Sequence, residues 1–179
     1  MPANTFSTVR DLLRHAVTRF NQAGLSFGQG SDNAFDEATF LILHTLKLPI
    51  DKLDPFLDAR LLPEEIKRVL EVIERRADQR IPASYLTQEA WLQGYRFYVD
   101  ERALVPRSFI AELIIEQFAP WVDDPDAVTT ILELCTGSGC LSIMLADAFP
   151  NAQIDAVDIS ADALAVARRN VDEYGLQGD

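Results

Sequence analysis

Residues 129–160 read TTILELCTGSGCLSIMLADAFPNAQIDAVDIS, and this stretch decides the fold. The apolar run TILEL at residues 130–134 predicts a buried strand, the segment CTGSG after it predicts a tight loop, and a helix follows. A second strand, QIDAVD, occupies residues 153–158, and Ser160 is well placed to cap a second helix. An order of strand, helix, strand and helix with strands this short predicts a parallel sheet with right-handed crossovers.

The predicted sheet needs more strands than this stretch supplies. Two strands do not make a stable sheet, and strands that are apolar on both faces need further neighbours. We therefore predict an α/β fold in which residues 105–179 form the first half of a Rossmann-like sheet domain. On this prediction the chain ends part-way through the fold.

The preceding residues predict a different kind of structure. Apolar residues recur at helical spacing from Val9 to Phe20, and a second helix follows Asp32, a candidate N-cap, with Phe35 facing inward. A third helix begins at Pro63, which suits the first turn of a helix. The sequence thus predicts an all-helical domain over residues 1–80.

A short β-hairpin is predicted between the two domains. The apolar and aromatic residues on either side of Gly94 have the pattern of two short strands joined by a turn. We therefore expect residues 81–104 to form a hairpin linker between the helical domain and the sheet domain.

The loop after the first strand of the sheet is a candidate nucleoside site. Ligands of doubly wound sheets bind at the carboxyl ends of the strands, and Gly137 and Gly139 would let a ligand approach the backbone there. Asp158 ends the next strand, 19 residues after Gly139, where its carboxylate could accept hydrogen bonds from both hydroxyls of a ribose. The alternative is that the two glycines simply permit a tight turn.

The residues around the loop favour S-adenosylmethionine over a dinucleotide. Ser142 stands where the dinucleotide motif has its third glycine, and the acidic Glu133 precedes the loop. A carboxylate repels a pyrophosphate, whereas it attracts the ammonium group of a methionine moiety.

These motifs resemble those of the HemK-like protein-glutamine N5-methyltransferases. ELCTGSGC at residues 133–140 and AVDISADAL at residues 156–164 carry the general resemblance. LSFGQGSDN at residues 25–33 and VPRS at residues 105–108 resemble one branch, which methylates a glutamine of large-subunit ribosomal protein three. The resemblance covers essentially the whole chain and implies a class I methyltransferase domain, with S-adenosylmethionine as cofactor and a helical domain that docks the ribosomal protein.

The resemblance also implies roles for particular residues. The expected cofactor-binding residues come from the loop and from the end of the second strand: Glu133, Cys135, Thr136, Gly137, Ser138, Gly139, Asp158 and Ile159. Arg107 is expected near the substrate cleft, and a surface arginine at the start of a helix is the alternative.

The motif with which the family grips the glutamine amide is Asn-Pro-Pro-Tyr, and no Asn in this sequence is followed by Pro. We therefore expect a chain truncated before that motif and inactive by itself, and we assign no catalytic residue.

Composition and charge narrow the range of partners. The net charge is −12, which counts against general nucleic-acid binding and favours a basic partner such as the ribosomal protein. The alternative is that the acidity serves only solubility. No membrane span or signal peptide is indicated. Cys135 and Cys140 have neither a disulfide nor a zinc spacing, so we expect no metal and a cytoplasmic protein.

Two other functions stay open at this stage. The same fold could methylate the amine of an adenine in a nucleic acid, since related enzymes share the family's motif. Alternatively, the chain could be a non-catalytic module that binds proteins through its helical domain.

Overall fold

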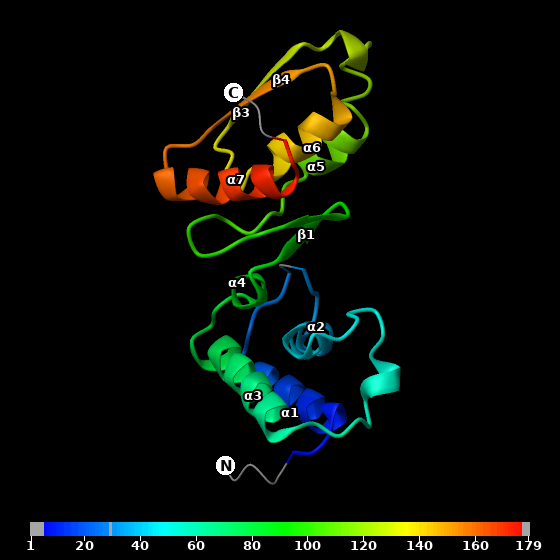
Figure 1. Cartoon of the computed structure of the whole chain (residues 1–179), viewed down its shortest axis with the longest axis vertical. Coiled ribbons are helices and arrows are strands. Elements are labelled where there is room, and N and C mark those ends of the chain that lie inside the picture. Colours follow the sequence, from blue (N-terminus) through cyan, green and yellow to red (C-terminus); the bar gives the residue numbers. More distant parts are fainter. Residues whose placement is uncertain (1–5, 29, 177–179) are drawn as a thin grey trace. The chain divides into compact units, whose positions relative to one another are not determined.

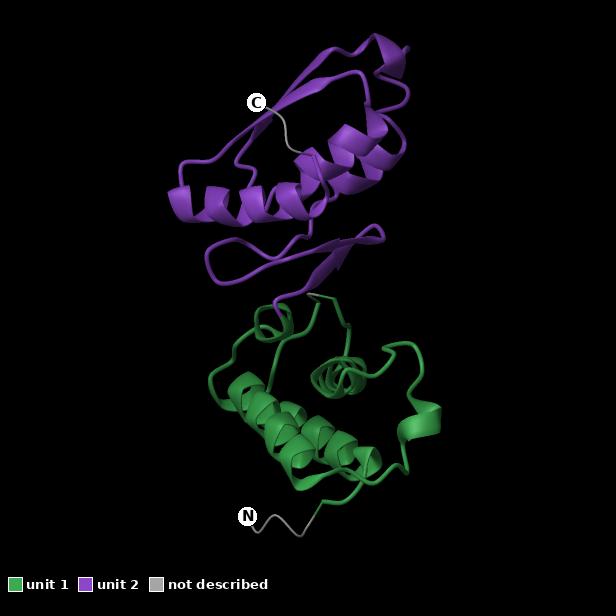
Figure 2. Cartoon of the chain, in the orientation of Figure 1, with its two compact units in different colours: residues 1–87 green, residues 88–179 purple. Residues whose placement is uncertain are grey.

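The computed structural model describes residues 6–28 and 30–176, so Gln29 of the LSFGQGSDN motif lies outside the described residues. The chain forms two compact units, residues 1–87 and residues 88–179 (Figure 2). In chain order the elements are α1 (Val9–Gln22), α2 (Ala34–Leu46), the 3-10 helix η1 (Asp54–Phe56), α3 (Pro63–Asp78), α4 (Ala83–Thr87), β1 (Ala90–Leu92), β2 (Tyr95–Phe97), α5 (Ile110–Ile115), the 3-10 helix η2 (Pro125–Ala127), β3 (Thr130–Leu134), α6 (Cys140–Ala148), β4 (Gln153–Val157) and α7 (Ala161–Glu173) (Figure 1).

The first unit is helical, as the sequence predicts. Helix α1 begins at a capping box in which Thr8 Oγ1 accepts from the Asp11 amide at 3.2 Å and the Asp11 carboxylate accepts from the Thr8 amide at 3.1 Å. The apolar faces of α1, α2 and α3 share one core, in which Val9 and Phe20 are fully buried. None of the described helices of either unit is long and apolar enough to cross a membrane.

Two predicted details of α2 are wrong. The N-cap is Asn33 rather than Asp32, because Asn33 Oδ1 accepts from the Asp36 amide at 2.9 Å. With the cap at this position Ala34 and Ala38 face the core, and Phe35, one residue further around the helix, is 50% exposed instead of facing inward.

The structure divides the chain at a different place from the three expected segments, 1–80, 81–104 and 105–179. Helix α4 belongs to the first unit because Ala83 and Leu86 pack into the helical core. Strands β1 and β2 form the predicted antiparallel hairpin, with Trp91 opposite Arg96. The hairpin belongs to the second unit because Phe97, fully buried, packs in one cluster with residues of α5 and α6.

The predicted parallel pair of strands is present in the second unit. Strand β3 pairs with β4 in a register that runs from Thr130 opposite Gln153 to Leu134 opposite Val157. The pair is partly buried on one face, where Ile131 and Ile154 pack against the cluster that contains α6. On the other face Leu132 is 63% exposed and Leu134 is 67% exposed, and no element of the described residues covers that face. This agrees with the expectation that the apolar strands need further neighbours.

Candidate functional site

The site is built on the loop that joins β3 to α6. Three of its residues have left-handed backbone conformations, with φ of 60° at Cys135, 57° at Gly137 and 77° at Gly139. The Thr136 amide donates to the Val157 carbonyl of β4 at 3.0 Å, and the Gly139 amide donates to the Thr136 carbonyl at 2.9 Å. The loop is therefore held against the carboxyl end of the neighbouring strand, as expected for ligand sites of doubly wound sheets.

The two glycines of the loop serve different structural purposes. A Cβ atom at Gly139 would lie 3.1 Å from the Cβ of Ala167, so this glycine permits close packing of the loop against α7. A Cβ atom at Gly137 would meet no atom within 4 Å. Gly139 thus serves helix packing, whereas the open side of Gly137 leaves the backbone accessible to a ligand.

Asp158 lies next to this loop, as the sequence predicts. Its Oδ2 accepts from the Gly137 amide at 2.9 Å and its Oδ1 accepts from the Ser160 amide at 2.9 Å. Hydrogen bonds from the Ser160 and Gly137 amides lower the pKa of this carboxyl below its ordinary value. Asp158 is therefore a carboxylate at neutral pH, and each oxygen retains lone-pair capacity for a further hydrogen bond.

Glu133 approaches the loop from within β3. Its Oε2 accepts from Thr136 Oγ1 at 2.8 Å and also from the hydroxyl of Ser142 in the first turn of α6. Oε1 takes part in neither hydrogen bond. In the sequence Ser142 stands out only as a missing glycine, so its role as a partner of Glu133 was not predicted; a hydroxyl in the first turn of an otherwise apolar helix is the signal that could have indicated it.

The remaining expected cofactor residues differ in exposure. The side chains of Thr136 and Ser138 are buried, whereas Cys135 and Ile159 are exposed and Ile159 stands fully in solvent. Glu133, Gly137 and Asp158 therefore lie at the carboxyl ends of β3 and β4. The exposed side chain of Ile159 adds an apolar surface next to them.

The expected place of Arg107 near the substrate cleft stays a prediction. Arg107 is exposed in the segment between β2 and α5, and no described contact joins it to the loop. In the described parts of the chain, no three His, Cys, Asp or Glu side chains are grouped to hold a metal ion. Both cysteines are free thiols, and burial raises the pKa of the Cys140 thiol.

Comparison with known proteins gives two findings. Residues 131–179 match a family model described as a methyltransferase domain. The chain is also similar to the ribosomal protein uL3 glutamine methyltransferases of Burkholderia pseudomallei (68% identical over 96% of this chain), Bordetella pertussis (64% over 95%) and Neisseria meningitidis (58% over 98%). The chain spans 56–58% of the length of these relatives.

Proposed function

We propose that this chain, which is related over at least 95% of its length to the ribosomal protein uL3 glutamine methyltransferases, is part of an enzyme that methylates a glutamine side chain of uL3. One structural observation carries the proposal. The loop with its open Gly137 lies within hydrogen-bond distance of the Asp158 carboxylate, at the carboxyl ends of two parallel strands.

The residues at this edge fit S-adenosylmethionine as the cofactor. Asp158 offers carboxylate oxygens to the ribose hydroxyls, and Glu133 offers an oxygen to the ammonium group of the methionine moiety. The exposed side chain of Ile159 would pack against the adenine, and Gly137 gives the ligand access to the loop backbone. When bound, the cofactor supplies a sulfonium methyl group.

In this proposal, residues of the chain bind the cofactor and orient it toward the glutamine amide. The transfer would join the glutamine amide nitrogen to the methyl carbon as the bond from that carbon to sulfur breaks, and the amide proton would leave to solvent. An amide nitrogen is a poor nucleophile, so holding donor and acceptor in line supplies much of the rate. Glu133 and Asp158 fix the donor side, and the family's Asn-Pro-Pro-Tyr motif, which holds the acceptor, is not among residues 1–179.

The helical unit is the proposed substrate-recognition part. It is a separate compact unit, and none of the expected cofactor residues lies in it. We propose a cytoplasmic location, because the proposed substrate is a ribosomal protein.

The test is methyl transfer by the full-length enzyme in vitro. Purified enzyme, S-adenosylmethionine with a labelled methyl group, and uL3 from cells that lack the gene should give label on one glutamine of uL3. The controls are uL3 from wild-type cells, which should take up little label because its glutamine is already methylated, and protein-free ribosomal RNA. Label on the RNA instead of uL3 would favour an adenine-amine methyltransferase, and absence of label on every substrate would favour a non-catalytic binding module.

A further inference from the structure

Two side chains from α7 and its C-terminal end form hydrogen bonds with backbone groups of the hairpin strand β2 and the residue that follows it. Tyr174, at the end of α7, accepts from the Arg96 amide and donates to the Arg96 carbonyl, both at 3.0 Å. Four residues earlier, Asn170 accepts from the Tyr98 amide at 2.8 Å and donates to the Tyr98 carbonyl at 3.0 Å. Backbone groups two residues apart share one edge of a strand, and helix residues four apart share one face, so these side chains take the place of a strand partner.

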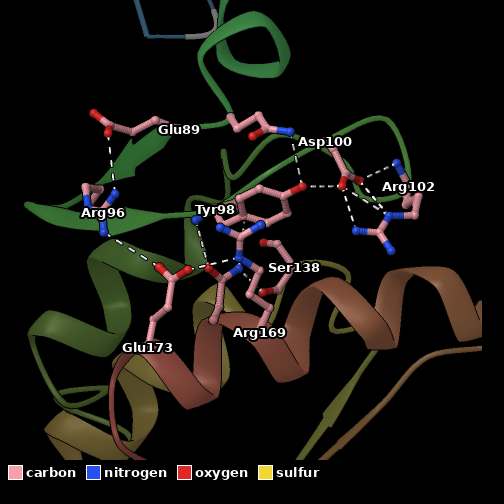
Figure 3. A network of polar contacts seen from close by, with 10 residues as sticks. Glu89, Arg96, Tyr98, Asp100, Arg102, Ser138, Arg169 and Glu173 are labelled. Carbon is pink, nitrogen blue, oxygen red and sulfur yellow. Dashed lines mark hydrogen bonds and ion pairs between the residues drawn. The ribbon is translucent and has the colours of Figure 1, made fainter. Parts of the chain in front are cut away.

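Tyr98 is a well-fixed point of the hairpin. The guanidinium carbon of Arg169 lies 3.4 Å from the centre of the Tyr98 ring, and the Tyr98 hydroxyl donates to Asp100 at 2.7 Å (Figure 3). The carboxylate of Asp100 also accepts from the amide and the guanidinium of Arg102. The Arg102 guanidinium is the main cause that holds the pKa of Asp100 well below its usual range.

Asn170 differs from Tyr174 in having a further partner. Its Nδ2 also donates to the Ser138 carbonyl in the glycine loop at 2.8 Å. Asn170 is 1% exposed and Ser138 is 2% exposed, so no water can replace this bond without opening the core. Asn170 uses both Nδ2 hydrogens as donors, which is the full donor capacity of the side chain, and its amide oxygen accepts from the Tyr98 amide.

This bond fixes one peptide group of the loop from both ends. The carbonyl of the Ser138–Gly139 peptide is held by Asn170, and its N–H donates to the Thr136 carbonyl at 2.9 Å. The peptide plane sets the direction in which the left-handed Gly139 turns the chain into α6. A loop held in its binding shape before the ligand arrives binds with less ordering cost.

We propose that Asn170 is a positioning residue for the cofactor: it sets the shape of the Cys135–Gly139 loop and ties that shape to the hairpin at Tyr98. The proposal rests on the proposed function, because it takes the loop to be the cofactor site. Because Asn170 is buried, it would act through the loop and not by direct contact with the substrate or cofactor.

The test uses the full-length enzyme and pairs two substitutions on the same face of α7. Asn170→Asp replaces the donating NH2 by an oxygen that faces the carbonyls of Ser138 and Tyr98. Tyr174→Phe removes the matching hydrogen bonds to Arg96 and leaves the loop untouched. Asn170→Ser is a smaller second variant in case the aspartate variant fails to fold.

The readouts separate positioning from stability. S-adenosylmethionine affinity is measured by calorimetry at a temperature where circular dichroism shows each variant folded, and kinetics give kcat and the KM for the cofactor. We expect the Asn170 variants to bind the cofactor about tenfold more weakly or worse, with a raised KM and little change in kcat at saturation. Tyr174→Phe should stay within about twofold of the wild type, although its melting temperature falls.

Four outcomes would overturn the inference. If the folded Asn170 variants bind S-adenosylmethionine as tightly as the wild type, Asn170 has a purely structural role. The same conclusion follows if both variants fail to fold. An equal loss of affinity in Tyr174→Phe would show that hairpin anchoring, not the loop contact, is responsible. A wild-type enzyme that binds no cofactor would instead refute the proposed function, and with it this inference.

Discussion

At the scale of single residues, the site depends on how Asp158 and Glu133 divide their hydrogen bonds. Asp158 receives one backbone amide at each oxygen, from Gly137 and Ser160, and so is both fixed and ionised. Glu133 receives two hydroxyls at Oε2. Both carboxylates are thus oriented by the protein before a ligand binds, which favours tight and specific recognition of polar groups.

We predict that Asp158→Ala in the full-length enzyme weakens S-adenosylmethionine binding about tenfold or more, because two charge-assisted hydrogen bonds to the ribose are lost. Asp158→Asn keeps the shape but removes the charge, so it should give a smaller loss. Calorimetry measures both. An Asp158→Ala enzyme within threefold of the wild-type affinity would show that the ribose is bound elsewhere.

At the scale of elements, the strand pair β3–β4 presents an uncovered apolar face. Leu132 and Leu134 project from it and are each more than 60% exposed, and Val157 of β4 is 44% exposed. Exposed apolar strands with free edges associate with other chains. We therefore expect this face to promote self-association when residues 1–179 are studied by themselves.

We predict that residues 1–179 self-associate, so that their mass in light scattering rises with protein concentration. Leu132→Lys with Leu134→Lys should shift the chain toward the monomer. Leu104→Lys is the matched control, since Leu104 is 62% exposed in the same unit but lies outside the sheet. A wild-type chain that is monomeric at every concentration, or a control as effective as the double variant, would refute this assignment.

The elements also show which features could be predicted from sequence. Helical spacing and strand–loop–helix order predicted α1, α3, β3, β4 and the loop between β3 and α6, since these depend on residues close in the chain. Asn170 was missed because its partners, Tyr98 and Ser138, lie 72 and 32 positions away. Its place on the buried face of α7, among Ala163, Val166 and Ala167, is the signal that a buried polar partner was required.

At the scale of the whole molecule, the two units differ strongly in charge. Residues 1–87 contain 12 acidic and 11 basic residues, whereas residues 88–179 contain 16 acidic and 5 basic residues. If the proposed function holds, attraction of a basic substrate to residues 1–179 would come mainly from the second unit, and recognition by the helical unit would rest on shape and apolar contacts. The sequence alone shows that negative charge accumulates toward the C-terminus, and the boundary between the units assigns that charge to the second unit.

We predict that residues 1–87 fold alone and melt cooperatively by circular dichroism. Their core is shared by α1 to α4, and the buried ion pair of Arg76 with Glu37, at 2.6 Å, joins α3 to α2 within the unit. Binding of uL3 to this unit should change little with salt, whereas the affinity of the full-length enzyme for uL3 should fall as salt rises. A disordered spectrum, or equal salt dependence in the two, would contradict this division of roles.

The central claim is that this chain belongs to an enzyme that methylates a glutamine of uL3, and mass spectrometry of uL3 from living cells tests it most directly. Deleting the gene should leave the target glutamine unmodified, and the full-length gene should restore one methyl group. A gene that ends after residue 179 should not restore it, since the motif that grips the amide is not in these residues. A glutamine of uL3 that stays methylated after the deletion would contradict the account.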